Sequence, residues 1–296
     1  MLLNINSSKY FRIALQLILA VVFLISAYSK FISPGLIEII LVDQGITASR
    51  NTAAYLVRIL LAVEFAIGIL YLQPFSIKKI VIPASIALLL FFTGYLFYTG
   101  FILGDKENCG CFGTLIEMSP VESVIKNVVL IILSAPLYRM IKEEKKNFVI
   151  PVVALTASLV FVFTFAPIRD VKDFKFEKYK AFVGEGRVDL SGGEKLLAVF
   201  SLDCEHCRQT AKEIARLTKA NKKIPPVYVL FFSEGGVSVD EFNKMTNSDF
   251  PYHMIETNEF FDLIGSTPPR IYWLSNGTIK EHWDADFEEN IDKNFR

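Results

Sequence analysis

Cysteine and net charge are the two features that this 296-residue sequence has least of. Its 31 basic residues are balanced by 31 acidic ones, so nothing suggests a nucleic-acid partner, which would select a basic surface. The sequence contains only four cysteines, too few for a disulfide-stapled scaffold. They form two close pairs, Cys109/Cys111 and Cys204/Cys207, and such pairs are typical of redox or metal chemistry.

Long apolar runs lie almost entirely within the first 168 residues. A helix needs roughly 20 apolar residues to cross a bilayer. Five stretches qualify, at 11–31, 52–72, 80–100, 121–140 and 148–167. We therefore predict an α-helical membrane bundle with four transmembrane helices at 1–145, a fifth tethering helix and linker at 146–182, and a globular domain at 183–296.

Lysine and arginine are distributed unevenly between the two ends of these spans. The richer set of ends carries Lys9, Arg12, Lys78, Lys79, Arg139, Lys142, Lys145 and Lys146. The opposite set carries Lys30, Arg50, Lys106 and, at the interface, Lys126. The positive-inside rule places the richer set in the cytoplasm. We therefore expect a multi-pass protein of a bacterial inner membrane, with both cysteine pairs facing the oxidising periplasm or exterior.

The segment 183–296 alternates strand-like and helix-like stretches. Residues 195–203 and 226–234 have strand composition, while helical patterns are found at 208–221, 239–246 and 258–265, the last with Gly265 as its C-cap. A hairpin follows, with Asn276-Gly277 suited to a type I′ turn. This order of strand, CxxC, helix, strand and proline-led hairpin resembles the thioredoxin-like superfamily. "VDLSGGEKLLAVF" (188–200) resembles the lead-in of its membrane-tethered TlpA branch.

The resemblance to thioredoxin-like proteins implies specific roles. Cys204 matches the nucleophilic cysteine and Cys207 the resolving one. Pro268, preceded by Thr267, matches the cis-proline that packs against the disulfide, with Pro269 as the alternative. Asp203 stands where the superfamily usually has tryptophan, and this leaves the redox potential open.

The "CEHC" motif also indicates redox chemistry without the resemblance. A cysteine at a helix N-terminus meets unpaired N–H groups and the positive end of the helix dipole, which favour the thiolate. A protonated His206 would favour it further, whereas the charge of Glu205 opposes it. Cys207, one turn later, is placed to resolve a mixed disulfide. The alternatives are a structural pair or a metal site, although two cysteines do not complete a zinc shell.

Cys109 and Cys111 flank a single glycine in the loop before the fourth span. A disulfide across one residue is strained and easily reduced, which favours an electron-accepting pair. Two free thiols, a soft-metal pair and a bridge that pins the loop are the alternatives.

"CGCFG" followed by "SPVESVIKN", together with "SAYSKF" and "RILLAVEFAIGIL", resembles the MauE/DoxX group of four-helix membrane proteins. MauE is associated with a thioredoxin-like partner, so this chain resembles both roles in one polypeptide.

Glu64 falls near the middle of the second predicted span, where a carboxylate is costly and usually functional. We expect an intramembrane proton site, part of a quinone site, or a protonated acid that is hydrogen-bonded between helices. Direct pairing with Arg58 is not expected, because the two are about 9 Å apart along the helix. Lys30 and Lys126 are expected to reach the outer surface as anchors.

The sequence thus predicts a membrane-bound thiol–disulfide oxidoreductase. It would pass electrons between Cys204/Cys207, Cys109/Cys111 and extracytoplasmic disulfide-containing clients, in a direction that the sequence does not specify. No cofactor is required; a quinone is compatible but lacks support, since comparable quinone-coupled oxidases have two membrane cysteine pairs. The alternatives are soft-metal (copper) handling, which the shortage of nearby Met and His disfavours, and a non-catalytic assembly factor for an extracytoplasmic enzyme.

Overall fold

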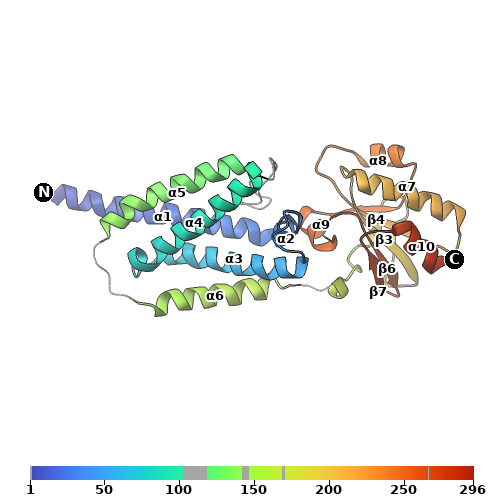
Figure 1. The fold of residues 1–296 in the computed structure, drawn as a ribbon. Helices are drawn as coiled ribbons and strands as arrows, with labels where there is room; N and C mark the ends of the chain where they lie inside the picture. The colour runs from blue at the N-terminus through green and yellow to red at the C-terminus, as the bar shows by residue number, and fades with distance from the viewer. Residues whose placement is uncertain (1, 103–118, 142–146, 169–170, 266) are drawn as a thin grey trace. The chain divides into compact units, whose positions relative to one another are not determined.

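The computed structural model describes residues 2–102, 119–141, 147–168, 171–265 and 267–296. The predicted Cys109/Cys111 pair lies outside these residues. The chain divides into two compact units, Met1–Ile168 and Arg169–Arg296, which are described separately below (Figure 1).

The described residues of the first unit form mainly helices (Figure 1). Among the residues that the structure describes, four helical stretches are long and apolar enough to cross a membrane, by length and composition. They are formed by α1 (Leu2–Ile32), α3 (Arg50–Tyr71), α4 (Ile82–Phe97, with π-helical turns η1 Ile77–Val81 and η2 Tyr98–Ile102) and α5 (Pro120–Met140). This confirms the predicted helical membrane region, and the chain is a multi-pass membrane protein. The fifth predicted span coincides with α6 (Val149–Phe165), an apolar helix of 17 residues, at the short end of the range that spans a bilayer.

Helix α3 occupies the centre of the first unit. In an 18-residue apolar stretch of α3, 61% is buried inside the protein. The corresponding share in the other three candidate spans is 28–33%. It packs against α1, α6 and the short helix α2 (Pro34–Asp43), while α5 packs against α1 and α4. Leu61 and Ala62 of α3 share a buried hydrophobic cluster with Val162 of α6. A residue on α3 therefore has neighbours on several other helices.

Gly68 lets α1 approach α3 closely. A Cβ atom at this position would lie 2.7 Å from Leu24 Cγ and 3.3 Å from the Leu24 backbone nitrogen. We expect Gly68→Ala to lower the free energy of unfolding by about 1–3 kcal/mol, because the added methyl overpacks the contact. Gly94→Ala on α4 is the matched control. It should not lower the free energy of unfolding, because its Cβ would meet no atom within 4 Å. Thermal denaturation in detergent compares the two, and equal stabilities would contradict the proposed close contact.

The second unit is built on a five-stranded sheet in the order β5-β4-β3-β6-β7. Strands β3 (Glu194–Ser201), β4 (Val227–Phe232) and β5 (Tyr252–Met254) are parallel, and β6 (Arg270–Ser275) and β7 (Thr278–Trp283) are antiparallel to their neighbours. A two-stranded ladder, β1 (Ala181–Phe182) and β2 (Gly186–Arg187), precedes it. Asn276 and Gly277 both have positive φ, 48° and 76°, so the predicted type I′ turn is confirmed.

Both faces of this sheet are covered. Helices α7 (Glu205–Ala220), α8 (Val239–Thr246) and α10 (Phe287–Phe295) share a buried core with one face, which includes Phe200, Phe231 and Ile271. On the other face, Phe232 stacks on Phe260 of α9 (Thr257–Leu263) with ring centroids 4.5 Å apart. A central β3 that leads through CxxC into α7, between parallel β4 and antiparallel β6, is the thioredoxin-like arrangement. The predicted α/β fold class is confirmed.

Some elements differ from the sequence-based expectation. Helices α2 and α10 and strand β5 were not predicted, and each is too short for a clear periodicity. Helix α9 ends at Leu263 with Ile264 as its C-cap, so the prediction of Gly265 as the cap is wrong. Gly265 instead packs against charged side chains, as described below.

Candidate functional site

Cys204 is held at the start of α7 by the end of the central strand. Strand β3 stops at Ser201, and Cys204 becomes the N-cap with extended backbone angles, φ −82° and ψ 120°. Its sulfur accepts a hydrogen bond from the backbone N–H of Cys207 at 3.2 Å. The side chain of an N-cap residue ordinarily supplies this acceptor as oxygen, and here the sulfur takes that place.

These contacts lower the pKa of the Cys204 thiol to about 6 from an ordinary value of 9.0. The largest cause is a hydrogen bond from the Cys207 side chain, followed, among the stabilising causes, by the backbone N–H groups of Cys207 and His206. Partial burial opposes the shift, and the positive charge of His206 assists it. Cys204 is therefore mostly thiolate at neutral pH, even though exposed Glu205 stands beside it.

Cys207 has the opposite character. It is fully buried in the core between the sheet and α7. Burial is the main cause that raises the pKa of its thiol far above the ordinary range, and the adjacent Cys204 raises it further. Both cysteines are free thiols in the structure. The pair thus combines a partly exposed thiolate with a buried, protonated thiol.

Asp203, which replaces the usual tryptophan, attaches the motif to the loop after β4. Its carboxylate accepts a hydrogen bond from the backbone N–H of Glu234 at 2.8 Å. A Cβ at Gly236 would lie only 2.6 Å from the other carboxylate oxygen. The residue before Cys204 and the 234–236 loop are therefore held together. The Gly-Gly pair at 235–236 was the only sequence signal for this contact.

The cis peptide bond lies between Pro268 and Pro269, so the cis-proline is Pro269, the alternative that the sequence left open, and not Pro268. Both bonds that precede these prolines can adopt the cis form, and the sequence alone does not separate them. In the structure Pro269 comes directly before β6, whose first residue, Arg270, pairs with Val199 of β3. Because β3 runs from Val199 towards Cys204, the proline loop lies at the same edge of the sheet as the motif. Thr267 is exposed and Pro268 is half-buried.

An ion pair between buried Arg270 and exposed Asp284 supports the start of β6. The Arg270 guanidinium donates to both carboxylate oxygens of Asp284, at 2.6 and 2.8 Å. A Cβ at Gly265 would approach Asp284 Oδ1 to 2.7 Å and Arg270 Nη2 to 2.9 Å. Only glycine leaves room for this bidentate pair, and the pair in turn fixes the residue that follows the cis-proline.

Metal ligands do not gather in the part of the chain that the structure describes. Its residues contain no group of three or more His, Cys, Asp or Glu side chains placed to hold a metal ion. Cys109 and Cys111 fall outside that part.

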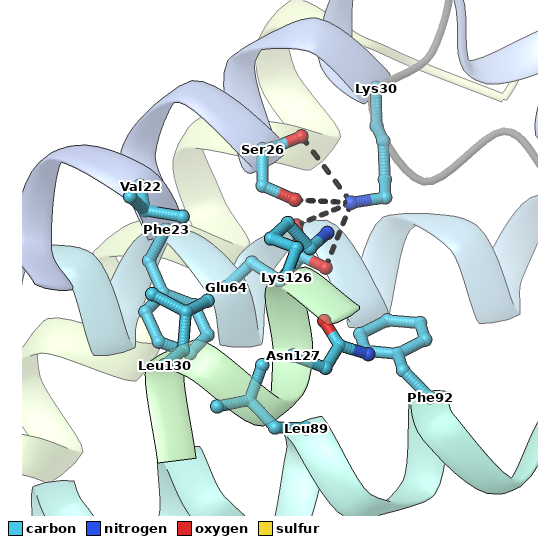
Figure 2. Close-up of a pocket in the computed structure, with 10 residues that line it drawn as sticks. All are labelled: Val22, Phe23, Ser26, Lys30, Glu64, Leu89, Phe92, Lys126, Asn127 and Leu130. Carbon is cyan, nitrogen blue, oxygen red and sulfur yellow. Dashed lines mark hydrogen bonds and ion pairs between the residues drawn. The ribbon is translucent and has the colours of Figure 1, made fainter. Parts of the chain in front are cut away.

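In the membrane region, Glu64 forms an ion pair that the sequence did not predict (Figure 2). The Lys30 ammonium lies 3.0 and 2.9 Å from the two Glu64 carboxylate oxygens and 2.6 Å from Ser26 Oγ. Lys30 is only 4% exposed, so the expectation that it anchors at the surface is wrong. Its side chain turns inwards because an unpaired carboxylate inside an apolar bundle is very unfavourable. Pairing with Glu64 outweighs the hydration that the lysine loses.

A second buried ionic cluster joins α3 to α2 and α6. The Arg58 guanidinium donates to Glu38 of α2, and Arg50 also contacts Glu38 at 3.0 Å. Arg58 further donates to the backbone oxygen of Ala166, the C-cap of α6, at 3.1 Å. As expected, Arg58 does not pair with Glu64. Glu38 was missed because α2 itself was not predicted.

Comparison with known proteins found similarities to both parts of the chain. Residues 8–139 match the family model for methylamine utilisation protein MauE. Protein TlpB of Flavobacterium psychrophilum is 28% identical over 338 aligned residues, which cover 94% of this chain and 92% of that protein. The thioredoxin domain of a thiol-disulfide oxidoreductase from Bacteroides vulgatus is a structural neighbour with 15% identity and a TM-score of 0.30, covering 40% of this chain and 91% of that domain. The chain therefore joins a MauE-like membrane region to a thioredoxin-like domain in one polypeptide.

Proposed function

We propose that the protein is a membrane-bound thiol–disulfide oxidoreductase with Cys204 as its nucleophile. The observation that carries this proposal is the contrast within the pair, a Cys204 thiol with a pKa of about 6 beside a buried Cys207 with a raised pKa. A thiolate, and not a thiol, attacks disulfides, and a low-pKa thiol is also a good leaving group.

The reaction proceeds through a mixed disulfide. The Cys204 thiolate attacks one sulfur of a client disulfide, and the other client sulfur leaves as a thiolate. Cys207 then loses its proton and attacks the Cys204 sulfur, which releases the second client sulfur. The client has gained two electrons and the pair has become a disulfide. The reverse sequence oxidises a client dithiol.

The membrane pair Cys109/Cys111 is the proposed exchange partner of Cys204/Cys207 within the same chain. Attachment to one polypeptide replaces a bimolecular encounter by an intramolecular one, which raises the effective concentration of each pair near the other. Both pairs would face the periplasm or exterior, together with disulfide-containing clients. This assignment is based on the lysine and arginine bias of the span ends.

A trapping experiment tests the relay. Cys207→Ala, with a protease site inserted in the 169–180 linker, leaves the mixed disulfide of Cys204 unresolved. After acid quenching, alkylation and cleavage, we expect the two halves to stay joined on a non-reducing gel. Replacing Cys109 and Cys111 as well should separate them. Halves that separate while Cys204 is joined to other proteins would restrict the function to clients, and a Cys204 that is joined to nothing would contradict the proposal.

A further inference from the structure

The 234–236 loop, which follows β4, runs alongside the CxxC motif. Strands β3 and β4 are parallel neighbours (Figure 1). Their pairing continues beyond both strands, because the Leu202 backbone N–H donates to the Phe232 oxygen at 2.9 Å. One residue further on, the Asp203 carboxylate accepts from the backbone N–H of Glu234 at 2.8 Å. The loop is therefore attached to the residue that directly precedes the nucleophilic cysteine.

Both carboxylate oxygens of Asp203 face this loop. Oδ2 accepts the hydrogen bond from the loop, and a Cβ at Gly236 would lie 2.6 Å from Oδ1, too close for a real contact. Gly235 has a φ of 99°, which favours glycine, and its N–H donates to Ser233 Oγ at 3.0 Å. The course of the loop beside the motif thus depends on one carboxylate and two glycines.

The loop presents its main chain to a molecule that approaches Cys204. Glu234, Gly235 and Gly236 are all exposed, and the two glycines have no side chain that would cover their peptide groups. Glycine is typical of positions where a backbone comes close to a ligand. An extended peptide can form hydrogen bonds with such exposed peptide groups, whereas a small disulfide compound without peptide groups cannot pair with them in this way.

We propose that Asp203 positions the 234–236 loop as a docking site for the main chain of a client, next to the cysteine that reacts. This inference rests on the proposed function and names its class of substrate, a disulfide carried by an extended peptide segment. The chemistry is the exchange described above, in which the protein dithiol becomes a disulfide and the client disulfide becomes two thiols. Asp203 takes no part in these bond changes and is a positioning residue.

The test compares two disulfides as substrates of the reduced full chain, with Cys109 and Cys111 replaced by serine. One probe is 2-hydroxyethyl disulfide, which has no peptide group. The other is the disulfide-linked dimer of a short peptide with one central cysteine, blocked ends and no charge, so that electrostatic attraction does not contribute. Acid quenching and alkylation of the remaining thiols give a rate constant for each probe. The ratio of the peptide constant to the small-disulfide constant cancels the fraction of folded protein.

Asp203→Ala should lower this ratio about tenfold, because the loop loses the charged acceptor that holds it. Asp203→Asn should preserve the ratio, since the amide oxygen still accepts from the Glu234 N–H. Gly236→Ala should also lower the ratio, because its methyl displaces the carboxylate or the loop. Atoms of Asp203 are all that this methyl would meet within 4 Å. The double variant Asp203→Ala/Gly236→Ala should therefore have the same ratio as Asp203→Ala.

Gly192→Ala is the matched control, because this glycine also lies beside an aspartate. Its Cβ would be 3.8 Å from Asp189 Oδ2, an ordinary contact, and it precedes β3, at the end of the strand away from Cys204. Its ratio should equal that of the parent protein.

Two further outcomes separate this inference from the proposed function. If both probes react and neither Asp203→Ala nor Gly236→Ala changes the ratio, the inference is overturned while the proposed function stands. If the parent protein reacts with neither probe, the proposed function is contradicted, and the inference with it. If Asp203→Ala does not fold, Gly236→Ala alone decides.

Discussion

In protein that retains only Cys204 and Cys207, alkylation of Cys204 by iodoacetamide should be half-maximal near pH 6, the pKa of its thiol. At that pH a thiol of pKa 9 would be ~0.1% thiolate, whereas Cys204 is ~50% thiolate. The thiolate fraction of Cys204 is thus ~500-fold higher, but a low-pKa thiolate is intrinsically about 20-fold less nucleophilic. Cys204 should therefore react ~20-fold faster at this pH than a thiol of pKa 9. Cys207 should not react, because it is fully buried.

Cys207→Ala should raise the midpoint of Cys204 alkylation by about one pH unit or more. The reason is that the hydrogen bond from the Cys207 side chain is the largest cause of the low pKa of Cys204. The backbone N–H groups of α7 remain, so the midpoint should stay below 9.0. Cys204→Ser is the control and should remove the fast reaction. A midpoint near 9 in the parent protein would contradict the site.

The same shift makes the stability of the reduced domain depend on pH. The folded pKa of Cys204 is lower than its ordinary value, so the thiolate stabilises the folded state fully above pH 9. This contribution is lost as the pH falls through about 6. Stability should therefore rise with pH between these values in the parent protein and not in Cys204→Ser.

Removal of either partner of the Lys30–Glu64 pair should destabilise the membrane region by about 3–5 kcal/mol, because the remaining charge stays buried. Glu64→Leu should lower the free energy of unfolding more than Lys30→Met does. Lys126 lines the same small pocket as Lys30 and Glu64, so without Lys30 the carboxylate still has a lysine nearby. Thermal denaturation in detergent measures both changes.

The double variant Lys30→Met/Glu64→Leu should be more stable than the sum of the single changes implies, because it leaves no buried charge of the pair. Lys9→Met is the matched control on the same helix and should have little effect, since Lys9 is exposed. A coupling energy below about 0.5 kcal/mol in this double-mutant cycle would show that the two residues act independently.

Features that depend on local sequence were predicted well. The apolar runs at 11–31 and 52–72 are long enough to require helices, and α1 and α3 include nearly all of each. The Asn276-Gly277 turn follows from the ability of these residues to adopt positive φ. A strand that runs directly into "CEHC" places Cys204 at a helix N-terminus, where its chemistry is largely set by unpaired backbone N–H groups.

Features that join residues far apart in the chain were decided only by the tertiary structure. Lys30 and Glu64 are 34 positions apart, and Asn127 and Thr93 are also 34 apart, so no periodicity relates them. Which of Pro268 and Pro269 follows the cis bond was also shown only by the structure. The sequence thus determined which segments cross the membrane and where the thiolate forms, because helix length and N-terminal N–H groups are local properties. The partners of buried charges depended on packing, because a side chain turns inwards only where another element supplies the opposite charge.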